Sequence, residues 1–195
     1  PADHSVYIGL QRKNSDDVFD AFPFFEDTGS DSERFDPEKA KNDTPQILNG
    51  FTDGEIARDY RPGSDTWHSG DLSFTIYTPV FSIPDPLSAN TEELKRIITP
   101  AVLIEISVDN SACSHPRTAF FGFTGNDPYS AMRFYNGSSE DPFTGIGQGL
   151  HIAVGTRDKG VLSGLGFSAE NILACKNEKN LSFGLGNTGL ILMKV

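Results

Sequence analysis

The stretch AVLIEISV at residues 101–108, the segment DNSACSHP at 109–116 and the stretch RTAFFGF at 117–123 decide the fold class of this chain. The first and third are rich in β-branched and aromatic residues, which favour strands, and turn-forming residues separate them. This order is typical of two antiparallel strands joined by a loop. We therefore predict that residues 101–108 and 118–123 pair at the centre of a sheet, with Ile104 in the core.

Further short strands are predicted on both sides of this pair. Apolar and polar residues alternate at 72–77, as in a half-buried strand. Clusters of Gly, Asn, Asp and Lys separate the other runs, which are residues 6–10, 151–155, 161–167, 181–185 and 190–195. This spacing, with 19 glycines, favours an all-β antiparallel β-sandwich. We expect a single domain over residues 1–195, because no linker composition interrupts it.

One short helix is expected in this sandwich. Asn90 is followed three residues later by Glu93, an arrangement that caps the start of a helix, and Pro100 ends the pattern. The sequence therefore predicts a helix over residues 91–98. Residues 27–49 are polar and lack periodicity, so we expect a long surface segment there.

Charge and hydropathy exclude several classes of partner. Sixteen Lys and Arg against 27 Asp and Glu give a net charge of −11, which repels the phosphates of nucleic acids and anionic lipid. The apolar runs are far shorter than the ~20 residues of a membrane-spanning helix. We predict a soluble protein that binds neither nucleic acid nor membrane.

No cofactor, metal or catalytic residue is predicted. Cys113 and Cys175 lack the spacing of a zinc or redox motif and are expected to be free thiols. Residues 184–189 match the glycine spacing of a dinucleotide-binding loop, but a strand-like run follows where that loop requires a helix. The four histidines follow no nucleophile motif, and with 27 acidic residues adjacent pairs are expected by chance.

Two segments carry the residue types that contact sugars. Residues 65–71 combine Trp67 with acids and a histidine in an expected loop, although a lone Trp also fits a core or interface plug. Residues 126–133 combine an acid, an amide, a phenol and a guanidinium in an expected turn, with an ordinary capped turn as the alternative. The glycines of residues 145–149 predict a second turn. The candidate substrate-binding residues are Trp67, Asp127, Tyr129, Arg133 and Gln148.

Several short words of sequence occur in a fixed order along the chain. They include Tyr7-Ile8-Gly9-Leu10, Phe22-Pro23-Phe24-Phe25-Glu26, Ser64-Asp65-Thr66-Trp67, Thr75-Ile76-Tyr77-Thr78-Pro79, Ala119-Phe120-Phe121-Gly122-Phe123, Asp127-Pro128-Tyr129 and Gly147-Gln148-Gly149. In this order and spacing they resemble the amino-terminal half of glycoside hydrolase family 52, the retaining β-xylosidases. The resemblance covers essentially the whole chain.

The resemblance implies an amino-terminal β-sandwich packed against a carboxy-terminal (α/α)6 barrel that supplies both catalytic residues, a Glu nucleophile and an Asp general acid. It implies an enzyme of xylan degradation that removes terminal xylose from β-1,4-xylo-oligosaccharides by double displacement, without metal or cofactor. It also implies a cytoplasmic protein, and it leaves a homodimer open. Residues 1–195 would then be a fragment that is inactive by itself, which agrees with the abrupt strand-like run at residues 190–195.

Two other functions stay open on the sequence. One is a free-standing β-sandwich that binds glycans as a lectin-like module, and the other is an acidic hydrolase whose own triad assembles in space. A free module should close its fold within the chain. A fragment of an enzyme should instead expose an apolar patch where the missing domain docks.

Overall fold

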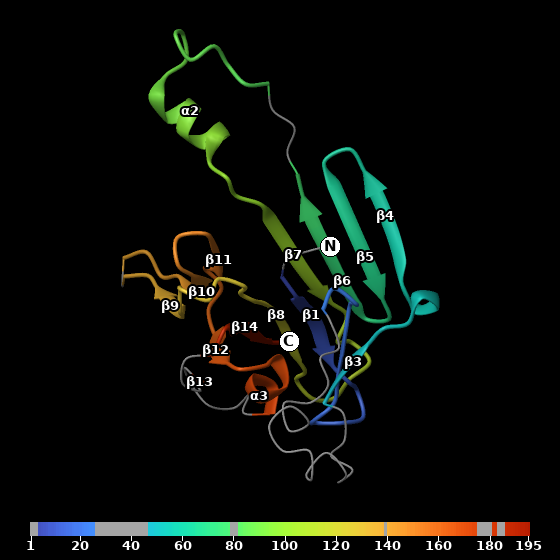
Figure 1. The fold of residues 1–195 in the computed structure, drawn as a ribbon. Helices are drawn as coiled ribbons and strands as arrows, with labels where there is room; N and C mark the ends of the chain where they lie inside the picture. Colours follow the sequence, from blue (N-terminus) through green and yellow to red (C-terminus); the bar gives the residue numbers. More distant parts are fainter. Residues whose placement is uncertain (1–3, 26–46, 79–81, 139, 175–180, 183–185) are drawn as a thin grey trace. The chain divides into compact units, whose positions relative to one another are not determined.

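The fold consists mostly of β-strands in three sheets (Figure 1). A computed structural model describes residues 4–25, 47–78, 82–138, 140–174, 181–182 and 186–195. The chain divides into two compact units, unit 1 with Pro1–Thr52 and Asn110–Val195, and unit 2 with Asp53–Asp109. The predicted all-β class with mainly antiparallel pairing is confirmed. That residues 1–195 act as one domain stays a prediction.

Unit 1 contains a sheet of seven strands and a sheet of three. The large sheet has the order β13-β12-β14-β8-β1-β2-β3, and its neighbours are antiparallel except for the pairs β2–β3 and β12–β13. Its strands are β1 (Val6–Gln11), β2 (Phe19–Ala21), β3 (Leu48–Gly50), β8 (Thr118–Thr124), β12 (Leu162–Gly166), β13 (Leu181–Ser182) and β14 (Thr188–Lys194). The small sheet has the order β11-β10-β9, from β9 (Met132–Asn136), β10 (Thr144–Gln148) and β11 (Ile152–Thr156).

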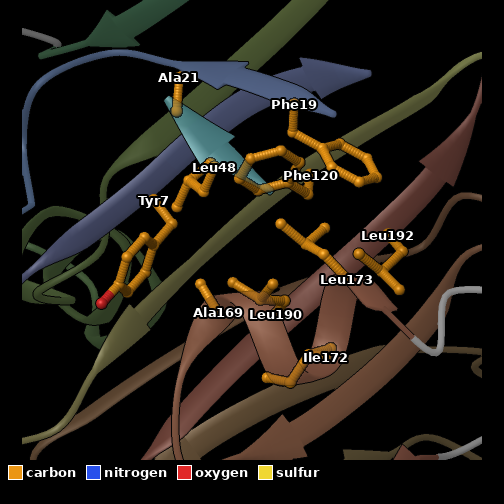
Figure 2. Packing of buried hydrophobic residues seen from close by; sticks show 10 residues of the cluster. All are labelled: Tyr7, Phe19, Ala21, Leu48, Phe120, Ala169, Ile172, Leu173, Leu190 and Leu192. Atoms are coloured by element: carbon orange, nitrogen blue, oxygen red, sulfur yellow. The ribbon is translucent and has the colours of Figure 1, made fainter. Parts of the chain in front are cut away.

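Strand β8 lies between β14 and β1, and its alternating side chains enter two cores. Phe120 belongs to the first core, in which helix α3 (Ala169–Ala174) packs on the large sheet (Figure 2). The members of this core are Tyr7, Phe19, Ala21, Leu48, Phe120, Ala169, Ile172, Leu173, Leu190 and Leu192. Phe123 belongs to the second core, where it meets Ile191 of β14 and Ile146 of the small sheet. The small sheet and α3 therefore cover opposite faces of the large sheet.

Helix α3 was not expected from the sequence, and glycines in β12 explain how it fits. A Cβ atom at Gly164 would lie 2.4 Å from Cγ2 of Ile172, and one at Gly166 would lie 2.9 Å from Cγ1 of the same residue. Contacts that short do not occur, so only glycine at these positions lets the helix lie so close to the strand. A segment of six helical residues is also too short for its periodicity to stand out.

Unit 2 is an antiparallel sheet of four strands in the order β4-β5-β6-β7, with helix α2 between β6 and β7. Its elements are a 3₁₀ turn (Asp53–Glu55), β4 (Ala57–Arg61), β5 (Ser64–Ser69), β6 (Leu72–Tyr77), α2 (Thr91–Ile98) and β7 (Leu103–Val108). The predicted helix is confirmed together with its cap, because the side-chain oxygen of Asn90 accepts a hydrogen bond of 2.8 Å from the backbone N–H of Glu93.

The predicted pairing of residues 101–108 with 118–123 is wrong. Strand β7 pairs with β6, and the N–H of Asp109 extends that pairing by donating to the carbonyl of Asp71 at 2.9 Å. Strand β8 pairs instead with β1 and β14, which come from the two ends of the chain. We expected β7 to pair with the strand that follows it after the shortest connection. It pairs instead with β6, the strand that precedes it across the longer connection that contains α2.

The expected long surface segment at residues 27–49 is also corrected at its end. Leu48–Gly50 form β3, which pairs in parallel with β2 at the edge of the large sheet. Near the end of this polar segment, the apolar side chain of Leu48 is buried in the first core. Residues 26–46 lie outside the described residues.

The burial pattern gives different stability costs for two matched truncations. Leu190 is fully buried on β14, whereas Ile104 is only partly buried on β7. We expect Leu190→Ala to lower the free energy of unfolding by about 3–5 kcal/mol, and Ile104→Ala to lower it by about 1 kcal/mol. Urea unfolding of the 195-residue chain measures both. Equal losses, or a larger loss at Ile104, would contradict the observed arrangement.

Candidate functional site

The candidate site is the turn that follows β8, residues 125–131, together with the end of β10. Two depressions adjoin this turn. One of about 520 Å3 is lined by residues 125–132 with Gly186 and Asn187, and one of about 420 Å3 is lined by His4, Asn126, Asp127, Gln148, His151 and Ile152. Asn126 and Asp127 line both depressions. The turn therefore borders both depressions.

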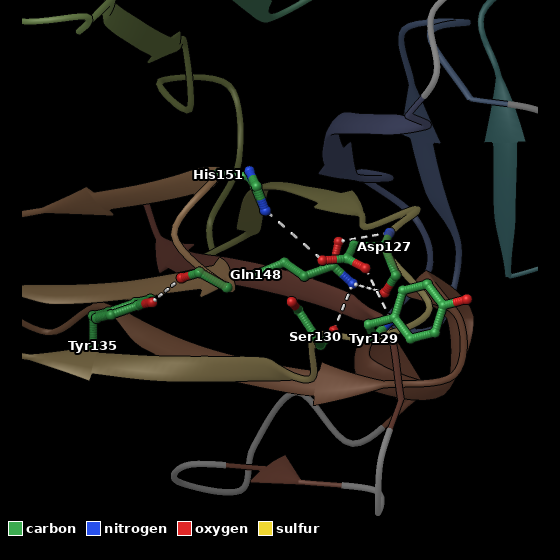
Figure 3. Close-up of polar contacts among 7 residues, drawn as sticks. Asp127, Tyr129, Ser130, Tyr135, Gln148 and His151 are labelled. Carbon is green, nitrogen blue, oxygen red and sulfur yellow. Dashed lines mark hydrogen bonds and ion pairs between the residues drawn. The ribbon is translucent and has the colours of Figure 1, made fainter.

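The side chain of Gln148 holds the backbone of this turn in place. Its position on β10 places it on the same face as the core residue Ile146, and the side chain is buried. The amide oxygen accepts from the backbone N–H of Asp127 at 3.2 Å, and the amide nitrogen donates to the carbonyls of Asp127 at 3.0 Å and Ser130 at 2.9 Å (Figure 3). Both amide hydrogens are thus used by the turn, so Gln148 fixes its backbone.

Glycine at position 125 makes room for this arrangement. A Cβ atom there would lie 2.1 Å from the amide oxygen of Gln148, so any other residue would push the amide away from the turn. The carbonyl of Gly125 also accepts from the Asn187 side chain at 3.1 Å. The entrance to the turn is thereby fixed from two directions.

Asp127 is a carboxylate in a network of donors. The hydrogen bond from the Ser130 side chain, with a second from the Tyr129 N–H at 2.9 Å, holds the pKa of Asp127 below its ordinary value of 3.8. The imidazole of His151 lies 3.9 Å from the same carboxylate and adds attraction when it is protonated. Asp127 is therefore ionised at neutral pH and can accept hydrogen bonds from a ligand.

Tyr129 is presented at the outside of the turn. Its side chain is 96% exposed, while its backbone N–H is tied to Asp127. Figure 3 shows the ring pointing away from the Gln148 amide. An exposed aromatic face on a fixed backbone is the kind of surface on which an apolar or pyranose ring can stack.

The other two candidate residues lie apart from this group, and neither is in the loop or turn that we expected. Arg133 lies on β9 opposite Gly147 of β10, on the exposed outer face of the small sheet and away from the face of Gln148. The expected second turn is likewise a strand, since residues 144–148 form β10 and the chain turns at Gly149, where φ is +58°.

Trp67 belongs to unit 2 and lies on β5 where a loop was expected. The guanidinium of Arg58 lies 4.6 Å from the centre of the Trp67 ring, within cation–π distance. Asp65 holds this guanidinium with two hydrogen bonds of 2.8 and 2.6 Å, which raise the pKa of Arg58 and lower that of Asp65. One face of the Trp67 ring is therefore covered by Arg58.

Two residues of the site were missed by reasoning from sequence, namely Ser130 and His151. The signal for Ser130 was an Asp followed three residues later by Ser, which is typical of a side chain that bonds within its own turn. His151 comes from the connection between β10 and β11, so only the pairing of these two strands brings it here. Ser130 bonds to Asp127, and His151 does not lie between them, which differs from the order of a hydrolytic triad.

Among the described residues no group of three or more metal-ligating side chains occurs. In the same part of the chain, no helix has the length and apolar composition needed to cross a membrane. Cys113 is a free thiol, as expected, and Cys175 lies outside the described residues.

Comparison with known proteins gives a consistent result along the whole chain. The sequence profile of glycosyl hydrolase family 52 matches residues 1–195. A β-xylosidase of Geobacillus stearothermophilus is 39% identical over 198 residues, which cover all of this chain and 28% of that protein. A second β-xylosidase of the same organism is 34% identical over 164 residues, which cover 79% of this chain and 26% of that protein. The chain thus spans little more than a quarter of the length of these relatives.

The buried amide of Gln148 gives a stability prediction. We expect Gln148→Leu to lower the free energy of unfolding by about 1–3 kcal/mol, because it leaves the N–H of Asp127 and two carbonyls without partners. Amide hydrogen exchange at residues 126–130 should become faster. Tyr129→Ala is the control, and its effect on unfolding should stay within about 0.5 kcal/mol. Unchanged exchange in Gln148→Leu would show that the amide does not hold the turn.

The carboxylate of Asp127 gives a pH prediction. Its pKa is lower in the folded chain, so its interactions stabilise the fold above the ordinary pKa of 3.8 and are lost as the pH falls through the lowered value. We expect Ser130→Ala to raise the pKa of Asp127, because Ser130 is the main cause of the shift. Carbon-detected NMR titration of the carboxyl measures both forms. An Asp127 pKa that does not change in the variant would rule this cause out.

Proposed function

The chain belongs to glycosyl hydrolase family 52, and on that premise we propose that it is the amino-terminal, non-catalytic part of a retaining β-xylosidase. The match of the family over residues 1–195 carries this proposal, together with relatives named β-xylosidase that are more than three times as long. The complete enzyme would remove terminal xylose from β-1,4-linked xylo-oligosaccharides, in the cytoplasm, as a step in xylan degradation. Its (α/α)6 barrel would follow residue 195 and supply both catalytic carboxyls.

The carboxyl groups of the described residues support a non-catalytic role. A retaining glycosidase needs two carboxyls about 5–5.5 Å apart, and its general acid needs a raised pKa to stay protonated at neutral pH. Wherever a carboxyl pKa shift is resolved in the described part of the chain, hydrogen bonds lower it. These carboxyls belong to Asp65, Glu105, Asp127 and Asp141. Such groups are suited to accepting hydrogen bonds and poorly suited to donating a proton.

The turn at residues 125–131 would contribute to substrate binding in the complete enzyme. Tyr129 would stack on a pyranose ring, and the ionised carboxylate of Asp127 would accept hydrogen bonds from sugar hydroxyls. Gln148 would act through the turn that it holds. Arg133 lies on the outer face of the small sheet, and one face of the Trp67 ring is covered by Arg58. These two residues would contact substrate only if the rest of the enzyme reaches them.

The exposed Tyr129 beside an ionised Asp127 also favours a second candidate function, a lectin-like module that binds glycans without the rest of the enzyme. The two functions differ in what the isolated chain can do. A lectin-like module would bind xylo-oligosaccharides by itself. An enzyme fragment would bind them only after the sugar pocket is completed by the missing domain.

The test compares the complete enzyme with the 195-residue chain on an aryl β-xyloside. We expect turnover by the complete enzyme and none by the chain alone. In the complete enzyme, Tyr129→Ala should raise KM for xylobiose roughly 2–10-fold and leave kcat nearly unchanged, since the loss of a stacking contact weakens binding without touching the chemistry. Tyr60→Ala, which removes another exposed phenol, is the control. Turnover by the chain alone that disappears when one of its own acids is replaced would refute the proposal.

A further inference from the structure

The connection between β6 and β7 carries a concentration of exposed apolar side chains. Of eleven large hydrophobic side chains that are strongly exposed in the described residues, five fall between positions 82 and 103, each 65–95% exposed. They are Ile83, Leu87, Ile98, Val102 and Leu103. We call residues 82–103, which extend to the first residue of β7, the arm. Figure 1 shows α2 apart from the four strands of unit 2, within this connection.

Helix α2 within the arm has one apolar side that is only partly covered, since Leu94 and Ile97 are half-buried and Ile98 is 66% exposed. Leu94, Ile97 and Ile98 are spaced three and four residues apart and share this side, whereas Glu92 and Arg96 lie on the opposite side. None of the eight residues of α2 is buried. An isolated helix shorter than about 12–15 residues is marginal in water. The Asn90 cap and the exposed ion pair of Lys95 with Glu92 add little, so packing must come from elsewhere.

We infer that the arm docks the apolar side of α2 onto the part of the same polypeptide that lies outside residues 1–195. This inference rests on the proposed function, because it requires a longer enzyme. The matched region is 28% of the length of one relative, so most of such a protein is available to cover the arm. The occupant is then an apolar groove on the catalytic part of the enzyme.

Size and charge favour this occupant over a second copy of the chain. A stable interface between separate proteins buries about 1,200–2,000 Å2 and must offset the loss of translational and rotational freedom. A helix of two turns offers far less area. A covalently linked partner is held at an effective concentration of about millimolar, so a small contact suffices. Two copies would also bring together chains of net charge −11.

Photo-crosslinking in the complete enzyme tests the inference. The photoreactive residue p-benzoylphenylalanine replaces Ile98, and in a matched control it replaces Arg96 on the opposite side of the helix. The enzyme is produced as a mixture of unlabelled and 15N-labelled molecules, and the crosslinked peptides are identified by mass spectrometry. We expect Ile98 to give crosslinks to peptides outside residues 1–195, within single isotopic species, at yields at least fivefold above those of Arg96.

Three results would overturn the inference. Crosslinks between labelled and unlabelled molecules would indicate a second copy of the chain. Crosslinks confined to residues 1–195, or equal crosslinking yields at positions 98 and 96, would also contradict it.

As a second measurement, Ile97→Ser should speed amide exchange of residues 91–98 at least tenfold in the complete enzyme, while Glu92→Ser should not. Unchanged exchange in Ile97→Ser would show that the apolar side is not packed. Turnover of an aryl β-xyloside by the same preparations tests the proposed function separately, because it does not depend on where the arm docks.

Discussion

Burial of β8 on both faces is the constraint on which unit 1 depends. Phe120 and Phe123 of this strand point into different cores, and β1 and β14 flank it, so no edge or face of β8 meets water freely. The candidate site begins where β8 ends, at Gly125. The turn therefore starts from a strand that is packed on both faces and paired along both edges. A binding residue keeps its geometry in the absence of a ligand when a rigid element of the fold supports it.

Local patterns predicted the elements well, and long-range partners poorly. The helix at residues 91–98 and the strand at 72–77 have the bounds that their capping and alternation indicated, because these signals act between near neighbours. The partner of β7 could not be deduced, since β8 offered an equally apolar strand across a shorter loop. Helix α3 depends on glycines in a different element, and no pattern within its own residues reveals that dependence.

In the candidate site, too, local features were predictable from sequence and long-range contacts were not. Asp127 and Tyr129 share one turn, so residue type alone brought them together as candidates, and the structure keeps them together. Gln148 was nominated for its amide, yet its strand directs that amide inward to the backbone of the turn. Trp67 and Arg133 were grouped by chemistry, while the pairing of β4–β5 and of β9–β10 decides which faces they occupy. Sequence thus identifies the chemistry of side chains better than their direction.

Unit 2 is inserted into unit 1, and this affects the order in which the protein can form during synthesis. Strand β1 pairs with β8, so Tyr7 must wait for Gly122 to be made. At a synthesis rate of about 5–20 residues per second, the delay is roughly 6–23 s. During that interval all residues of the β4–β7 sheet, whose strands are neighbours in sequence, are synthesised. The inserted unit is thus able to fold before the large sheet is complete, while β1, which can pair early with β2, keeps one unpaired edge that is open to aggregation until β8 is made.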